Sequence, residues 1–217
     1  MVEVLSSSSA TGAAAPHRSP FVGHTSGERP ALNGHIGVRL SAGTLASVTQ
    51  VGTWHSGIDA LALALGTALR CDVPGRTGAL VHLHEALLLR TGPEEFMLIS
   101  QQQGVDMVGR LREHIAADLG SVTDLSHARC QIRIEGDRCR DTLSKMFALD
   151  FRESHFPLDQ ARLTGHHHVP CLLHRRGLDS FNMVVPSTYA FDQLSTLLDA
   201  AQEYGVALAL PEANGVA

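Results

Sequence analysis

The stretch LLLRTGPEEFML, residues 87–98, decides the fold, because LLHRRGLDSFNM at residues 172–183 matches it without a gap. Each stretch has an apolar run, a turn around a glycine and a second apolar run, a pattern typical of a β-hairpin. An internal match at a fixed offset indicates duplication. At an offset of 85 residues, the matching pairs are Arg90 with Arg175, Gly92 with Gly177, Glu94 with Asp179, Phe96 with Phe181 and Leu98 with Met183.

The sequence around the first hairpin predicts one further strand and two helices. We expect the strand at about Gly43–Val51. Leucines at helical spacing within residues 53–70 predict a helix before the hairpin, and a second apolar stripe predicts one after it, ending at Gly120. The members of the two stripes are Leu61, Leu65 and Leu69, then Val105, Val108, Leu111, Ile115 and Leu119.

The second half repeats this order around its own hairpin. ARCQIRIEG at residues 128–136 alternates apolar and polar side chains, as a half-buried strand does. Asp137 can cap a helix running to Phe147. Residues 161–185 predict two strands around Gly177. Ser187 opens a last helix that ends at Gly205, and VALAL forms the closing strand.

This order predicts an α+β fold made of duplicated ferredoxin-like (βαββαβ) halves. We place the halves at about 35–120 and 121–210, within one domain spanning 35–217. Residues 1–34 are rich in Ser, Ala and Gly, and predict a mobile N-terminal arm.

Composition excludes several function classes. The net charge is −5 and Lys145 is the sole lysine, which argues against a nucleic-acid partner. No apolar run approaches the roughly 18 residues of a membrane helix, and the N-terminal residues do not have the pattern of a secretory signal. Four cysteines without a CxxC pair favour a reduced, cytoplasmic location.

Four histidines and a cysteine within LTGHHHVPCLLHRR, residues 163–176, raise the question of a metal site. If residues 161–175 form one strand, His166 and His168 share a face. Zinc needs a third and usually a fourth protein ligand, however, and His174 would lie about 20 Å further along the strand. We therefore favour an edge strand open to solvent or to another subunit, as Pro170 also indicates.

Other polar groups give no recognisable catalytic motif. Asp124, Ser126 and His127 in DLSHARC suggest a triad, but three polar residues at a strand entry more often cap turns. His82 and His84 share a strand face and are expected to be exposed, with Glu85 pointing away. Signatures of common cofactor sites and nucleophiles, such as GxGxxG and GxSxG, are absent from the sequence.

Several longer segments, DLSHARCQIRIEGDRCRDTLSKMFALDF, SFNMVVPSTYAFDQLSTLLDAAQEYG and RTGPEEFMLIS, resemble the gamma subunit of heterotetrameric sarcosine oxidases. The resemblance runs from about Ser19 to Gly205. The same pattern is more distantly similar to the folate-binding domain of the glycine cleavage T protein, and implies an aminomethyltransferase folate-binding-domain-like fold. Its most specific positions are Asp124, Leu125, Ser126 and His127, with Gly92, Pro93, Glu94 and Phe96 in the first hairpin.

The resemblance implies a noncatalytic accessory subunit with alpha, beta and delta subunits as its partners. FAD, FMN, NAD, tetrahydrofolate and zinc are then expected in those partners, and no cofactor or catalytic residue in this chain. The assembly would oxidatively demethylate sarcosine or a related secondary amine, giving hydrogen peroxide and either formaldehyde or methylenetetrahydrofolate.

A second hypothesis is a stand-alone, folate-binding protein of one-carbon transfer. The T-protein pattern has paired aspartates where this chain has His84 and Glu85, so Glu85 is the one candidate folate contact. This departure weakens the folate hypothesis.

Overall fold

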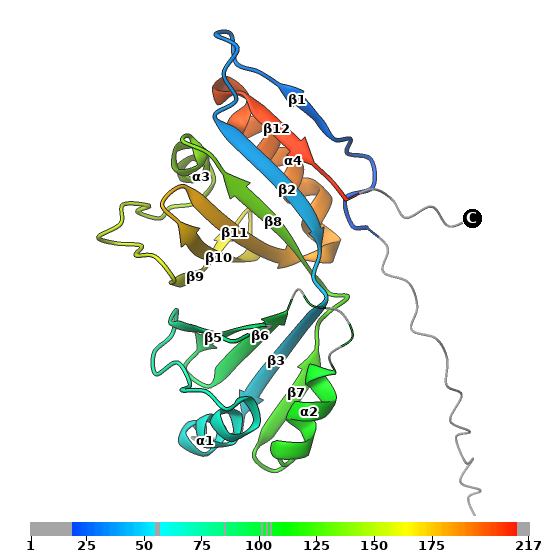
Figure 1. The fold of residues 1–217 in the computed structure, drawn as a ribbon, viewed down its shortest axis with the longest axis vertical. Coiled ribbons are helices and arrows are strands. Elements are labelled where there is room, and N and C mark those ends of the chain that lie inside the picture. The colour runs from blue at the N-terminus through cyan, green and yellow to red at the C-terminus, as the bar shows by residue number, and fades with distance from the viewer. Residues whose placement is uncertain are drawn as a thin grey trace, which may run out of the picture.

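The computed structural model describes residues 19–54, 57–84, 86–100, 102, 104 and 106–211. The chain forms two lobes, each built on one β-sheet (Figure 1). The first sheet contains β4 (Leu80–His82), β5 (Ala86–Gly92), β6 (Glu95–Ser100), β3 (Ser47–Thr53) and β7 (Gly120–Asp124), in that spatial order.

The second sheet has seven strands. In spatial order they are β1 (Gly27–Arg29), β12 (Val206–Ala209), β2 (Val38–Thr44), β8 (Arg129–Glu135), β11 (Ser180–Pro186), β10 (Val169–Gly177) and β9 (Ala161–His166). Neighbours pair antiparallel except β12 and β2, which are parallel.

The two sheets share one core arrangement of strands. In the first, the hairpin β5–β6 lies beside β3, and β3 lies beside β7. In the second, the hairpin β10–β11 lies beside β8, but β2 is inserted between β8 and β12. The strand at residues 38–44 therefore belongs to the second sheet, although its residues lie within the predicted first half, 35–120.

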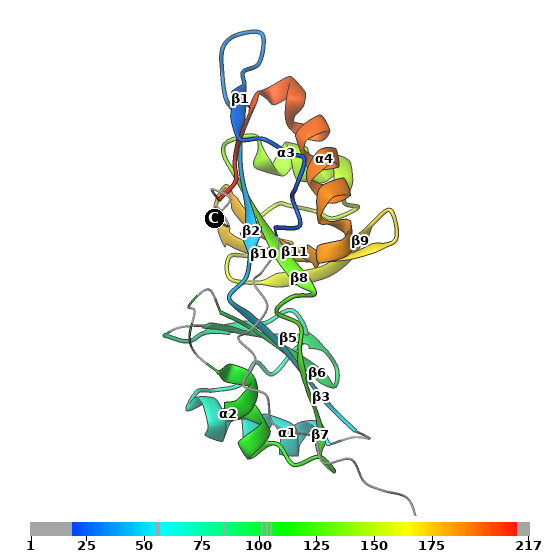
Figure 2. The same cartoon turned by 90° about the vertical axis from the view of Figure 1, so that its right-hand side faces the viewer.

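Helices cover the outer face of each sheet, as Figures 1 and 2 show. In the first lobe these are α1 (Ile58–Leu69) and α2 (Met107–His114), and in the second α3 (Cys139–Met146) and α4 (Ala190–Ala201), flanked by the 3₁₀ turns η1 (Ser187–Tyr189) and η2 (Gln202–Tyr204). Phe96 and Leu98 of β6 pack beneath α1 and α2 in the first core. The helix-facing core of the second lobe contains Phe181 and Leu194.

The inner faces of the sheets pack on each other through a third apolar cluster. Met97 and Ile99 alternate with Phe96 and Leu98 along β6, so they point away from the helices and toward the other lobe. Both faces of each sheet are thus apolar at the hairpins. The buried members of this inter-sheet cluster are Leu45, Val48, Leu89, Met97, Ile99, Ala161, Leu172 and Val184.

A two-stranded ribbon runs through both lobes and connects them (Figure 1). β2 continues into β3, and β7 continues into β8, so the chain crosses between the lobes at residues 44–47 and 124–129. β2 pairs with β8 above the crossing, and β3 pairs with β7 below it. The strand expected at Gly43–Val51 is therefore two strands, one in each sheet.

Local boundaries differ from several further expectations. The described part of the predicted arm packs against the second lobe, since Phe21 is buried and β1 pairs with β12. Residues 1–18, and Val105 of the second predicted stripe, lie outside the described residues. α2 ends at His114, before Gly120, and Asp137 does not cap α3 but accepts a hydrogen bond from the ring of His35. The last strand is confirmed at Val206–Ala209.

Candidate functional site

The two hairpins place equivalent arginines over equivalent phenylalanines. The guanidinium carbon of Arg90 lies 5.5 Å from the centre of the Phe96 ring, and that of Arg175 lies 5.7 Å from the Phe181 ring. Both phenylalanines are fully buried. In both hairpins the register shifts just after the arginine.

Each of these arginines also donates hydrogen bonds to three backbone carbonyls. Arg90 bonds the carbonyls of Gly92, Pro93 and Gly75. Arg175 bonds those of Gly177, Leu178 and Phe156. The Gly92, Pro93 and Phe96 positions of the family resemblance therefore form a hairpin turn held by an arginine, and Glu94, in the same turn, accepts a backbone hydrogen bond from Thr53.

The DLSH residues lie where the chain crosses from β7 to β8. The Ser126 hydroxyl donates to Asp124 Oδ1 over 2.5 Å and accepts the Val48 amide over 3.1 Å, while the Leu125 amide donates to the Val48 carbonyl. The His127 carbonyl accepts the Ser187 hydroxyl. Because Ser126 bonds Asp124 directly, the arrangement is not a triad, in which a histidine stands between the two.

Asp124 is the acid that organises this crossing. Partial burial raises the pKa of its carboxyl, but hydrogen bonds from the Ser126 hydroxyl and backbone amide outweigh burial, so the pKa lies below its usual value. The ionised carboxylate accepts both of these bonds at one oxygen. These contacts fix the path of the chain between the lobes.

The histidine run forms a tight turn and not a continuous strand. β9 ends at His166 and β10 begins at Val169, with His167 and His168 at φ of 47° and 66° between them. His166 is buried and bonds Gln193, whereas His168 is exposed, so the two do not share a face. The edge position expected for this segment is correct for β9, which forms one end of the second sheet, but wrong for β10, which contains Pro170 and lies between β11 and β9.

A different set of histidines comes together between the lobes. His82 Nε2 lies 2.9 Å from Asp159 Oδ1, and His174 Nε2 lies 3.7 Å from the same oxygen. His82 belongs to β4 of the first lobe, whereas Asp159 precedes β9 and His174 lies in β10 of the second. The strand pattern predicts His82 to be one of two exposed histidines, and nothing in the sequence connects it with His174.

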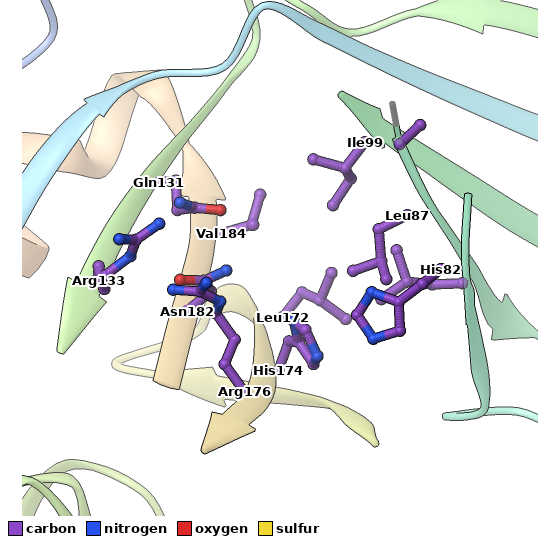
Figure 3. Close-up of a pocket in the computed structure, with 12 residues that line it drawn as sticks. His82, Leu87, Ile99, Gln131, Arg133, Leu172, His174, Arg176, Asn182 and Val184 are labelled. Carbon is purple, nitrogen blue, oxygen red and sulfur yellow. The ribbon is translucent and has the colours of Figure 1, made fainter. Parts of the chain in front are cut away.

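His174 and His82 line a cavity of about 280 Å³ between the two sheets (Figure 3). Leu87, Ile99, Leu172 and Val184 give it an apolar wall, and its polar wall comprises Gln131, Arg133, Arg176 and Asn182. His174 is almost completely buried, and this burial lowers the pKa of its imidazole to about 4. The imidazole is therefore neutral at neutral pH.

The remaining predicted site residues take no part in this cavity or lie outside the described chain. Glu85 is outside the described residues, and His84 next to it does not line the cavity. Cys71, Cys130, Cys139 and Cys171 are all free thiols, and burial raises the pKa of Cys130 and Cys139 to about 12. Within the described ranges, no helix has the length and apolar surface needed to cross a membrane.

Comparisons with known proteins find a matching family model and similar curated proteins. Residues 77–214 match the family model described as the GCVT N-terminal domain. A sarcosine oxidase subunit gamma from an Arthrobacter species is 30% identical over 164 residues, which cover 74% of this chain and 79% of the relative. One from a Corynebacterium species is 27% identical over 167 residues, covering 75% and 80%.

Solved structures agree in fold. A chain of the heterotetrameric sarcosine oxidase from a Corynebacterium species, in complex with pyrrole 2-carboxylate, superposes with a TM-score of 0.67 at 24% identity, covering 76% of this chain and 85% of that one. The glycine cleavage system aminomethyltransferase T from Bartonella henselae gives 0.59 at 15% identity, covering 81% of this chain and 48% of the other. The fold is thus mixed α+β and similar to aminomethyltransferases.

Proposed function

Because the chain belongs to the family of sarcosine oxidase gamma subunits, we propose that it is the accessory gamma subunit of a heterotetrameric amine oxidase. The observation that carries this proposal is the match to gamma subunits over three quarters of the chain and about four fifths of the relative's own length. Alpha, beta and delta subunits would be its partners.

The complex would oxidatively demethylate sarcosine or a related secondary amine. Its flavins, NAD and tetrahydrofolate would lie in the partner subunits. The methyl carbon of the amine would be released as formaldehyde or passed to the folate. The contacts of the family residues support this division: Ser126 and Asp124 hold the lobe crossing, and Gly92 and Pro93 form a hairpin turn. Each of these residues has contacts that stabilise the fold, so no catalytic role is needed to account for it.

We also propose that the two lobes derive from duplication of a ferredoxin-like βαββαβ unit. The common arrangement of hairpin, neighbouring strand and covering helices supports this origin. The equivalent contacts of Arg90 and Arg175 support it further. In this account β2 is an addition to the second unit, inserted between its first and last strands.

The proposed contact surface for the partners is the outer edge of β9 after Ala161, whose amide donates to the Gly78 carbonyl, together with the adjacent His167–His168 turn. Leu163 in the middle of β9 is 52% exposed, and an unpaired sheet edge offers backbone groups to another chain. The N-terminal residues 1–18 would add a second contact. His166 is excluded from this surface because it is buried.

A matched pair of variants tests this surface in the co-expressed complex. Leu163→Glu places a charge on β9, and Leu63→Glu places the same charge on α1, where the leucine is 74% exposed. We expect Leu163→Glu to reduce recovery of the partner subunits at least several-fold, with Leu63→Glu recovering them normally. Full recovery with Leu163→Glu would exclude β9 as the contact.

We place the assembly in the cytoplasm. The support is the chemistry of the four cysteines, which all remain unpaired, as thiols do in a reducing compartment.

A stand-alone folate-binding role has less support. The glycine cleavage aminomethyltransferase shares the fold at 15% identity, and fold similarity alone does not carry function. Titration of the isolated chain with tetrahydrofolate in a calorimeter separates the two functions. Heat of stoichiometric binding that Glu85→Ala abolishes would favour the folate role over the accessory one.

A further inference from the structure

Three potential metal ligands from both lobes converge at one end of the inter-sheet cavity. The ligand atoms of His82, Asp159 and His174 all lie within 4.8 Å of one another. Two imidazole nitrogens and a carboxylate oxygen form a donor set that suits Zn²⁺. In Figure 3 the rings of His82 and His174 lie close together at the boundary between the lobes.

His174 provides the second, independent observation. Its side chain is only 6% exposed, yet neither ring nitrogen has a hydrogen-bond partner among the described residues. The nearest acceptor, Asp159 Oδ1, is 3.7 Å from Nε2, beyond hydrogen-bond distance. A buried imidazole without hydrogen-bond partners destabilises the fold, and a metal ion on Nε2 would remove part of that cost.

The spacing of the three atoms fits a tetrahedral zinc ion after small adjustments. Bonds of about 2.0–2.2 Å place ligand atoms roughly 3.3 Å apart on a tetrahedron. The distances of 2.9 Å and 3.7 Å from Asp159 Oδ1 to the two imidazoles lie on either side of this value. His82 is 59% exposed, so its ring can rotate to bring the two imidazole nitrogens closer together.

We propose that His82, Asp159 and His174 form a zinc-binding site that links the first lobe to the second. The site is independent of the proposed accessory role, because it uses none of the residues that carry the family resemblance. It differs from the sequence expectation that zinc would occur in a partner subunit and not in this chain.

Three protein ligands leave one tetrahedral position for an exogenous ligand. His82 and His174 both line the cavity, so that position opens into it. Arg133 and Arg176 line the same cavity, and the Arg133 Nε has no hydrogen-bond partner within the described chain. The positive charge that these two arginines bring to the cavity favours a hydroxide or a small anion, such as a carboxylate, as the fourth ligand.

The test measures zinc in the full chain and, in parallel, in the co-expressed complex. Because the chain is rich in histidine, purification uses a tag without histidine. Zinc is quantified by elemental analysis after dialysis against a weak chelator, and Co²⁺ replaces it to report tetrahedral geometry by its visible absorption. Two variants, His82→Ala and Asp159→Asn, change exposed side chains and so spare the core. Asn also tolerates the positive φ of 51° at position 159.

A double variant, His167→Asn with His168→Asn, is the matched control. It removes two exposed histidines from the turn, where asparagine again tolerates the positive φ values. We expect about one zinc per chain in the isolated native protein and in the control. Because a partner subunit is expected to hold zinc of its own, the complex with the native chain should contain about one zinc more than the complex with either site variant. Each site variant should weaken zinc binding by more than about tenfold, since even residues that only support a ligand cost that much.

Three results would overturn the proposal. The first is a native chain without stoichiometric zinc after incubation with zinc alone. The second is zinc retained by both site variants, and the third is zinc lost from the turn control, which would indicate adventitious binding to surface histidines. Thermal unfolding provides a further readout: added zinc should raise the Tm of the native chain and control, but not that of Asp159→Asn.

Discussion

The hairpins of the two lobes make the same contacts in different surroundings. Arg90 and Arg175 each lie over a buried phenylalanine and each bond three backbone carbonyls, but Arg175 is fully buried whereas Arg90 is partly exposed. The third carbonyl differs as well: it belongs to Gly75 in the first lobe and to Phe156 in the second. Equivalent geometry therefore does not imply equal contributions to stability, because burial determines what is lost when a group is removed.

The largest difference is expected for the buried arginine. Arg175→Ala removes three donors and leaves the Phe156 carbonyl, at 2.6 Å from the guanidinium, without that bond in the core. The free energy of unfolding should fall by about 3–5 kcal/mol, as is usual when a buried charged network is broken. Urea denaturation of the full chain measures this change in the free energy of unfolding. A loss below about 1 kcal/mol would show that burial of this arginine is energetically unimportant.

Substitution of either phenylalanine should lower the free energy of unfolding by a similar amount. The pair therefore serves as a control for the comparison of the two arginines. Phe96 and Phe181 are both inaccessible to solvent, so Phe96→Leu and Phe181→Leu each remove the same buried aromatic atoms, although Phe181 also packs edge-on against the rings of Phe151 and Phe156. Both should lower the free energy of unfolding by about 1–2 kcal/mol. Parallel denaturant titrations compare the pair, and a difference above about 2 kcal/mol would mean that the lobes differ in core packing as well.

The smallest effect is expected for the half-exposed arginine. Arg90→Ala removes bonds to the Gly75 and Pro93 carbonyls, but water can replace the guanidinium there. The expected loss is about 1 kcal/mol. If Arg90→Ala destabilises the chain as much as Arg175→Ala under the same conditions, the comparison between the hairpins fails.

The repeated parts of the fold could be predicted from the sequence because their signals are local. Each hairpin carries its apolar runs, its turn and its arginine within a few residues, and α4 carries its own stripe. The insertion of β2 into the second sheet could not be predicted, since an alternating strand does not specify a distant partner. The turn at His167 and His168 was also missed, because it uses positive φ values at residues other than glycine or asparagine.

The candidate metal site could not be predicted either, because its ligands are far apart in the sequence. His82, Asp159 and His174 come from three segments that are distant in sequence, and only the packing of one sheet on the other brings them together. His166 and His168 are the histidine pair that the sequence suggests, but the turn between β9 and β10 separates their side chains. Local clusters of ligand residues were therefore a poor guide to the cluster that the fold creates.

The most direct test of the accessory role is affinity purification from the native host, using a tag on this chain, with mass spectrometry and a flavin spectrum of the eluate. The account predicts a yellow eluate in which this chain is accompanied by three further subunits, with amine-dependent peroxide formation. A colourless, single chain that binds no flavoprotein would contradict it.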